Sequence, residues 1–195
     1  MIDNDIMIAW GAVSKKYRKN EIIFLEGDAP RYYYQILSGK VKMYNTNDTK
    51  ELTQGIFTAG ESFGEPVLFI NETYPATAIT MEPTVVTRIL KERFFKLLEE
   101  YPELQKKFLK SFSTRIHEKS LLARELINSS PEDRILTFLT LYKKKKGVSD
   151  KLLRIDITRQ EIANFTGLCV ETVIRTLTRM STHKKVSIID KKLYY

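Results

Sequence analysis

The segment from Ile157 to Met180 constrains the fold of this 195-residue chain more than any other. Thr158 stands three residues before Glu161, which is the capping-box spacing that begins a helix. Gly167 predicts the end of that helix, because glycine readily adopts the left-handed conformation that closes many helices. A 3.6-residue apolar period resumes beyond it, at Val170, Val173, Ile174 and Leu177. The pattern predicts two short helices joined by a tight turn, which is a helix-turn-helix.

In a DNA-binding helix-turn-helix the second helix lies in the major groove, and its outward side chains meet bases and phosphates. The residues predicted to bind DNA are Thr158, Arg159, Gln160, Val170, Glu171, Thr172, Arg175 and Arg179. Glu171 and Arg175 stand one turn apart, so they are expected to hold one another in position and to read one G·C pair or two adjacent ones. The alternative is a pair of amphipathic helices packed around a glycine for purely structural reasons.

The residues of this segment also resemble a known family. Thr158-Arg159-Gln160-Glu161-Ile162-Ala163, then Gly167, then Glu171-Thr172-Val173 followed by Arg175, closely resemble the DNA-binding helices of the Crp/Fnr transcription regulators. Over almost the whole chain, the resemblance implies an α+β fold with three parts. These are an N-terminal antiparallel β-barrel of jelly-roll type, a long dimerisation helix and a C-terminal winged helix-turn-helix. It further implies a bacterial, homodimeric, sequence-specific regulator of transcription.

The predicted domain boundaries follow from changes in pattern along the chain. Residues 10–90 contain short apolar stretches separated by Gly, Asn and Asp, typical of an antiparallel sandwich or barrel. Residues 129–133 combine a linker, an N-cap, a first-turn proline and acidic residues, so they predict the start of a new domain. We expect a sensor barrel over 1–100, a dimerisation helix over 101–129 and a winged DNA-binding domain over 130–195. Within the last, a helix is expected over 134–146, a strand over 152–156 and a hairpin over 186–195.

The positive charge is concentrated in the predicted DNA-binding domain. Residues 1–129 carry 18 Lys and Arg against 17 Asp and Glu, whereas residues 130–195 carry 14 against 7. A basic surface is expected where a protein displaces counterions from phosphates. The run from Lys143 to Lys146 has two readings, a solvated helix end that matches the helix dipole, or a phosphate contact.

The candidate effector pocket departs from the pattern of the nucleotide-binding relatives. In those relatives Gly-Glu is followed by a short helix and Arg-Ser-Ala, whose Arg and Ser meet the cyclic phosphate. This chain keeps Gly64-Glu65 but reads Tyr74-Pro75-Ala76 at the matching place. No cation remains there to balance a phosphate. We therefore expect no cAMP or cGMP binding, and an effector that is apolar, uncharged or absent.

The helix expected from Pro102 to about Asn128 carries two apolar faces. One is a coiled-coil-like stripe, which predicts a homodimer interface formed by Leu109, Phe112, Ile116, Lys119, Ala123 and Leu126. The other face is expected to pack on the chain's own barrel and contains Leu104, Phe108, Leu121, Leu122 and Ile127. The alternative is a single wide face packed on one core.

The remaining expectations concern partners and exclusions. No apolar run approaches the ~18 residues of a spanning helix, so a cytoplasmic protein without membrane contact is expected. The single cysteine, Cys169, forms no cluster for zinc or iron–sulfur, and His117 and His183 are poorly placed to hold haem. We expect no cofactor, no metal and no catalysis.

The expected partners are a second copy of this chain, double-stranded DNA with an inverted repeat, and RNA polymerase as a further candidate. The alternative function is a ligand-binding signalling module whose basic domain docks a protein.

Overall fold

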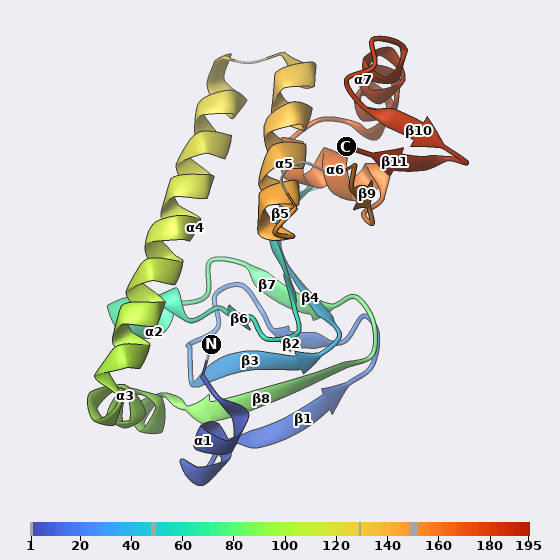
Figure 1. The fold of residues 1–195 in the computed structure, drawn as a ribbon. Coiled ribbons are helices and arrows are strands. Elements are labelled where there is room, and N and C mark those ends of the chain that lie inside the picture. Colours follow the sequence, from blue (N-terminus) through green and yellow to red (C-terminus); the bar gives the residue numbers. More distant parts are fainter. Residues whose placement is uncertain (1, 48–49, 129, 149–151) are drawn as a thin grey trace. The chain divides into compact units, whose positions relative to one another are not determined.

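The computed structural model describes residues 2–47, 50–128, 130–148 and 152–195, without the side chains of 47, 50 and 125–128. The chain forms two compact units, Met1–Ser113 and Thr114–Tyr195, and each is described here by itself (Figure 1). Among the helices of the described residues, none combines the length and apolarity that crossing a membrane requires.

The first unit is built on two four-stranded antiparallel sheets, with strand orders β1-β8-β3-β6 and β2-β7-β4-β5. The strands are β1 Val13–Tyr17, β2 Ile22–Phe24, β3 Tyr32–Ser38, β4 Lys40–Asn47, β5 Lys50–Thr58, β6 Ser62–Phe63, β7 Thr77–Thr80 and β8 Thr84–Leu90. Their inner faces enclose a core rich in aromatic rings, among them Phe24, Tyr34, Phe63 and Tyr74. The jelly-roll-like barrel predicted from the sequence is confirmed. The nine-residue strand β5 was not predicted, because its sequence lacks a continuous apolar alternation.

Helices cover one outer face of this barrel. They are α1 Asn4–Ala9, α2 Pro66–Ile70, α3 Lys91–Glu100 and the beginning of α4, which runs over Pro102–Asn128. Tyr33 of β3 stacks on Phe94 of α3 with ring centroids 4.5 Å apart. Leu104 and Phe108 of α4 are buried in the same cluster. The prediction that one face of this helix packs on its own barrel is confirmed for these two residues.

The second unit contains the predicted winged helix-turn-helix. Its elements after α4 are α5 Pro131–Lys145, β9 Arg154–Ile155, α6 Arg159–Thr166, α7 Val170–Thr182, β10 Ser187–Ile189 and β11 Lys192–Tyr194. The three strands form one antiparallel sheet in the order β10-β11-β9. The N-cap and first-turn proline predicted within residues 129–133 are confirmed, since Ser130 forms a capping box with Asp133 and α5 begins at Pro131, whereas the expected range 134–146 began three residues too late.

One face of α7 is buried in the core of this unit. Val173, Leu177 and Met180 are each 0% exposed and pack in a cluster with Ile162 of α6. Ile174, which the sequence pattern placed on the same apolar face, is 50% exposed, so that prediction was wrong. Successive residues of a helix point about 100° apart, so Ile174 lies to one side of the stripe formed by Val173, Leu177 and Met180. The outward orientation of α7 is therefore set by its buried residues.

The turn between α6 and α7 depends on Gly167. Its φ of 66° is left-handed, and its N–H donates to the carbonyl of Ala163. This is the helix-closing geometry that the sequence predicted.

Replacing Gly167 with Ala is expected to lower the free energy of unfolding by about 1 kcal/mol, because a Cβ is strained at this φ. Gly167→Asn should cost less, since Asn tolerates the left-handed region better than Ala. Urea denaturation followed by circular dichroism measures both changes. Unchanged unfolding midpoints in both variants would show that the turn does not require this conformation.

Candidate nucleic-acid interface

The start of α6 is fixed by a reciprocal cap. The hydroxyl of Thr158 accepts the N–H of Glu161 at 3.1 Å, and the Glu161 carboxylate accepts the N–H of Thr158. Gln160 is exposed and donates to Asn164 at 2.9 Å. Of the three residues predicted to bind DNA here, Thr158 caps α6, whereas Arg159 and Gln160 lie in its first turn.

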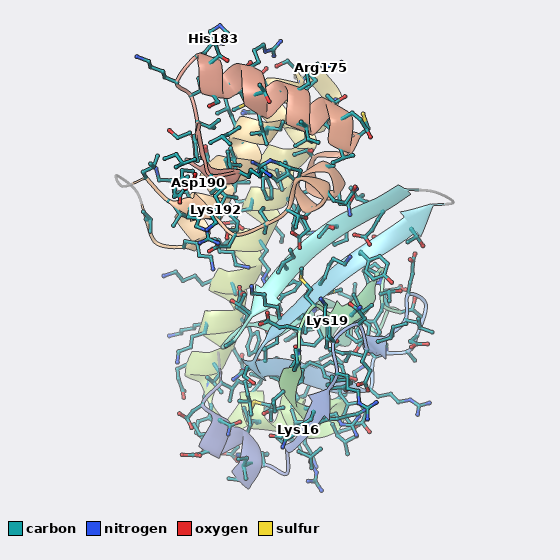
Figure 2. All side chains as sticks on the ribbon, turned by 90° about the vertical axis from the view of Figure 1, so that its right-hand side faces the viewer. Lys16, Lys19, Arg175, His183, Asp190 and Lys192 are labelled. Atoms are coloured by element: carbon teal, nitrogen blue, oxygen red, sulfur yellow. The ribbon has the colours of Figure 1, made fainter. Side chains whose placement is uncertain are left out.

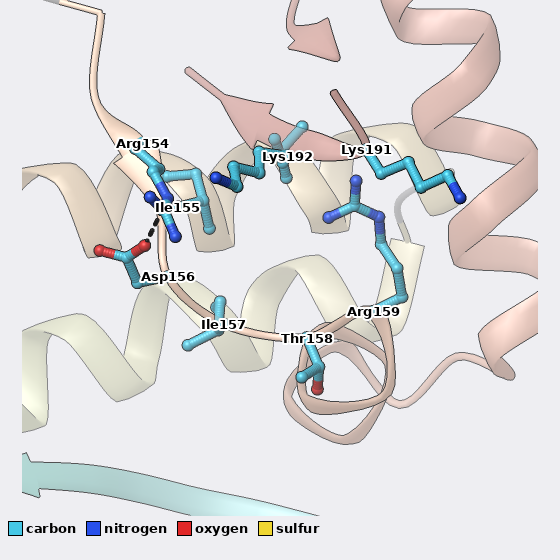
Figure 3. A pocket seen from close by; sticks show the side chains of 9 residues that line it. Arg154, Ile155, Asp156, Ile157, Thr158, Arg159, Lys191 and Lys192 are labelled. Carbon is cyan, nitrogen blue, oxygen red and sulfur yellow. Dashed lines mark ion pairs between the residues drawn. The ribbon is translucent and has the colours of Figure 1, made fainter. Parts of the chain in front are cut away.

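A positively charged hollow of about 430 Å³ lies beside this helix start (Figure 3). It contains four cationic side chains, and one of them, Arg154, pairs with Asp156 at 2.8 Å. Burial lowers the pKa of the Arg159 guanidinium, which still remains charged near neutral pH. Helix N-termini and cations both favour phosphate oxygens. The hollow is lined by Arg154, Ile155, Asp156, Ile157, Thr158, Arg159, Lys191, Lys192 and Leu193.

The tip of the β10–β11 hairpin brings lysines to this hollow. Asp190 and Lys191 have φ values of 48° and 63°, the positive values of a type I′ two-residue turn. Lys191 lies in this turn and Lys192 follows it, and both are exposed (Figure 3). These lysines were not among the residues predicted from the sequence to bind DNA. The Asp-Lys-Lys run between two apolar stretches was the signal that could have found them.

The outer face of α7 is an exposed stripe with helical spacing. Figure 2 labels Arg175 on this helix. No described acidic side chain forms an ion pair with Arg175, so the pairing expected between Glu171 and Arg175 is absent. Glu171 instead interacts with the thiol of Cys169.

The exposed residues on the outer face of α7 are Glu171, Ile174, Arg175, Thr178, Arg179 and Thr182. Ile174 and Thr178 were missed, although their spacing of three from Glu171 and Arg175 could have indicated them.

The other predicted residues of α7 are partly engaged within the protein. Val170 is half-buried and packs on the core of the winged unit. The hydroxyl of Thr172 lies 3.0 Å from the sulfur of Cys169, and this hydrogen bond lowers the pKa of the exposed thiol. Figure 2 places His183 at the end of α7, where Nδ1 lies 2.8 Å from the carbonyl oxygen of Arg179.

A cluster of charges anchors the far end of α7. Glu132 of α5 accepts from Lys185 at 2.6 Å and from Arg179 at 3.0 Å. The hydrogen bond from Lys185 is the main cause that lowers the pKa of the Glu132 carboxyl. Arg179 is therefore held by a carboxylate of its own unit, whereas Arg175 is open to solvent.

The predicted dimer stripe on α4 is strongly exposed at two apolar positions. Leu109 is 68% exposed and Ile116 is 66% exposed. Lys119 and Ala123 are exposed as well, and the side chain of Leu126 lies outside the described residues. Phe112 differs from the others, because its half-buried ring lies 5.5 Å from that of Phe69 in the cluster of its own unit.

The residues of the candidate effector pocket lie in or beside the barrel core. Tyr74 is 2% exposed and stacks on Phe24, with ring centroids 3.6 Å apart and an interplanar angle of 10°. A Cβ on Gly64 would lie 2.9 Å from Phe24 and 3.0 Å from Tyr74, so the two rings fill the space beside this glycine. Glu65 is fully buried and accepts the hydroxyl of Ser62 at 2.7 Å. Ala76 is also buried and Pro75 is exposed.

Comparisons with known proteins agree with both the barrel and the helix-turn-helix. Residues 14–101 match the model of the cyclic nucleotide-binding domain, and residues 155–184 match that of the bacterial regulatory proteins of the crp family. The transcriptional activator protein Anr of Pseudomonas aeruginosa is 30% identical over 91% of this chain and 74% of its own length. The fumarate and nitrate reduction regulatory protein of Vibrio cholerae is 28% identical over 91% of this chain and 72% of its own length.

Solved structures share the fold. The c-di-GMP responsive regulator CLP of Xanthomonas campestris has a TM-score of 0.78 at 24% identity, covering 98% of both chains. A CooA mutant of Carboxydothermus hydrogenoformans has a TM-score of 0.81 at 17% identity, covering 98% of this chain and 85% of its own.

A cyclic-nucleotide-binding-type barrel followed by a winged helix-turn-helix defines a class of DNA-binding transcription regulators. Within that class, this chain belongs to the Crp/Fnr family of transcription regulators.

The filled space beside Gly64 generates a prediction about cyclic nucleotides. Titrating cAMP or cGMP into the protein should give no saturable heat, because Tyr74 occupies the place where a phosphate-binding cation is expected and Pro75 offers no hydroxyl. Calorimetry measures this directly, with titration of DNA as the control for active protein. Saturable binding of either nucleotide at micromolar concentrations would contradict the prediction.

Proposed function

We propose that this chain acts as a homodimer that recognises an inverted-repeat DNA site through α7. The observation that carries the proposal is the orientation of α7. Its buried residues Val173, Leu177 and Met180 turn Glu171 and Arg175 outward, and no described acidic side chain pairs with Arg175. An arginine in that position is available to donate to a base edge.

In this proposal the reading of bases rests on two residues of α7. The Arg175 guanidinium donates to O6 and N7 of a guanine, and the Glu171 carboxylate accepts from N4 of a cytosine. In the resembled family a further Arg stands before the Glu, whereas this chain has Val170 there. Val170 is half-buried, so Ile174, at 50% exposure, supplies the larger apolar surface for a thymine methyl group. The half-site should therefore be less rich in G than that of relatives with the additional Arg.

Phosphate contacts surround the base-reading residues. Thr158, Arg159, Lys191 and Lys192 line the positively charged hollow at the start of α6, and Gln160 is exposed in the first turn of the same helix. Such contacts position the protein on the duplex without selecting sequence. The excess of 14 Lys and Arg over 7 Asp and Glu in residues 130–195 supports this role.

The dimer is the second part of the proposal. We assign residues 1–100 to the sensor barrel, 101–129 to the dimerisation helix and 130–195 to the DNA-binding domain. Leu109 and Ile116 are apolar, strongly exposed and two turns apart on α4, which is the spacing of a helix–helix seam. Lys119, Ala123 and Leu126 would continue that seam, with Phe112 bridging it to the protomer's own core.

The wider biological assignments follow from this function. A regulator that binds the chromosome acts in the cytoplasm, and RNA polymerase is the partner through which it would change transcription. The proposal gives the chain no catalytic activity. The second candidate function, a module whose basic domain docks a protein, predicts no preference among DNA sequences.

The base-reading residues can be tested by site selection from random DNA. Arg175→Ala should weaken binding to the preferred site by roughly 1 to 3 kcal/mol and flatten the preference at one G·C pair. Lys144→Ala is the matched control, because an exposed lysine on the end of α5 should weaken all sequences alike and reduce the salt dependence. Enrichment of an identical half-site by wild type, Arg175→Ala and Val170→Arg would show that other residues read the bases.

The dimer can be tested by placing charges on the exposed seam. Leu109→Glu combined with Ile116→Glu should give monomers of 22.7 kDa in sedimentation, because like charges would meet across the seam. Both positions are exposed in the protomer, so its own core should remain intact. Lys107→Glu, an exposed position on the opposite side of α4, is the control and should stay dimeric. A dimeric double variant would place the interface elsewhere.

A further inference from the structure

The barrel unit contains a hollow of about 340 Å³ at one end of its aromatic core. Its wall is formed by the rings of Phe24, Tyr32, Tyr34 and Tyr74, from β2, β3 and the segment before β7. Two cations, Arg31 and Arg88, also line it. The volume lies within the range of roughly 300–1,000 Å³ that is usual for small-molecule sites.

Arg88 is the residue that gives this hollow a chemical preference. It lies on β8 directly opposite Tyr34 of β3, and its guanidinium carbon stands 4.6 Å from the ring centre of Tyr32. The guanidinium also makes a hydrogen bond with the Tyr34 hydroxyl. Its Nε is buried, and among the described residues no acceptor bonds to it. No described carboxylate forms an ion pair with Arg88.

A buried donor without an acceptor destabilises a protein, and a partly buried cation without a counter-ion does so as well. Asp28, the acidic residue of the hollow, accepts the N–H of Leu25 at 2.9 Å and forms no ion pair with Arg88. An external anion would supply both a hydrogen-bond acceptor and a counter-ion for the Arg88 guanidinium. Carboxylates match the planar fork of a guanidinium with two parallel hydrogen bonds.

We propose that this hollow binds a small aromatic carboxylate, whose carboxylate pairs with Arg88 and whose ring packs among Phe24, Tyr32 and Tyr34. Flat aromatic walls favour a planar ligand, since offset and edge-to-face ring pairs stabilise the contact beyond area burial alone. The exposed Arg31 adds positive potential at the rim.

The position of Arg88 revises the expectation of an uncharged effector. That expectation considered residues 64–76 alone, where Tyr74 and Pro75 remove the expected phosphate partners. Arg88 comes from β8, and only the β3–β8 pairing brings it beside Tyr34. The cation therefore reaches the barrel from a different strand. That such a ligand would act as an effector rests on the proposed DNA-binding function, whereas its binding does not.

The test uses benzoate, phenylacetate and the uncharged analogue benzamide with the full chain in the absence of DNA. Saturation-transfer NMR titrations should show saturable binding of at least one carboxylate, and about tenfold weaker binding of benzamide than of benzoate. This comparison of ligands needs no protein variant. Failure of binding here leaves the DNA-binding proposal untouched, because no DNA is present.

Variants then locate the site. Arg88→Met should weaken carboxylate binding about tenfold or more, whereas Arg18→Met, an exposed arginine outside the hollow, should bind as wild type does. Circular dichroism verifies that both variants are folded. The proposal is overturned if neither carboxylate binds to wild type, if benzamide binds as well as benzoate, or if a folded Arg88→Met variant binds unchanged.

Discussion

The burial of one face of α7 is the interaction on which the DNA-binding function of this chain depends. Val173, Leu177 and Met180 have no exposed surface, so α7 cannot rotate about its axis without exposing them to water. That fixed rotation turns Arg175 and Glu171 to solvent. The cap of α6 at Thr158 and the left-handed Gly167 set how α6 leads into α7. The two residues proposed to read bases are therefore positioned by apolar packing, and among the described residues neither forms an ion pair.

In the barrel, aromatic packing replaces the polar chemistry that the nucleotide-binding pattern leads one to expect. Tyr74 and Phe24 stack face to face, with ring centroids 3.6 Å apart, and their rings fill the space beside Gly64. Burial raises the pKa of Tyr74, and it raises the pKa of Tyr34 to about 12. Both phenols therefore stay neutral near neutral pH. The positive charge of this region comes instead from Arg88 on β8 and from Arg31.

The sequence predicted elements with strong local signals and failed where the decisive information was not local. The capping box at Thr158, the run Thr84–Leu90 and the helix from Pro102 to Asn128 appear within a residue or two of expectation, because apolar period and capping residues determine them locally. Strand β5 was missed, since Gly55 and several polar residues interrupt its pattern. The exposure of Ile174 and the place of Arg88 depend on packing and strand pairing, which a single sequence does not display.

The central claim is that α7 reads the major groove of an inverted repeat. Dimethyl sulfate footprinting on a selected site tests it most directly, because the reagent methylates guanine N7 in the major groove and adenine N3 in the minor groove. The account predicts protection of guanine N7 in two symmetry-related half-sites, centred about 34 Å or one helical turn apart. Protection confined to adenine N3, or guanine protection in a single half-site, would contradict it.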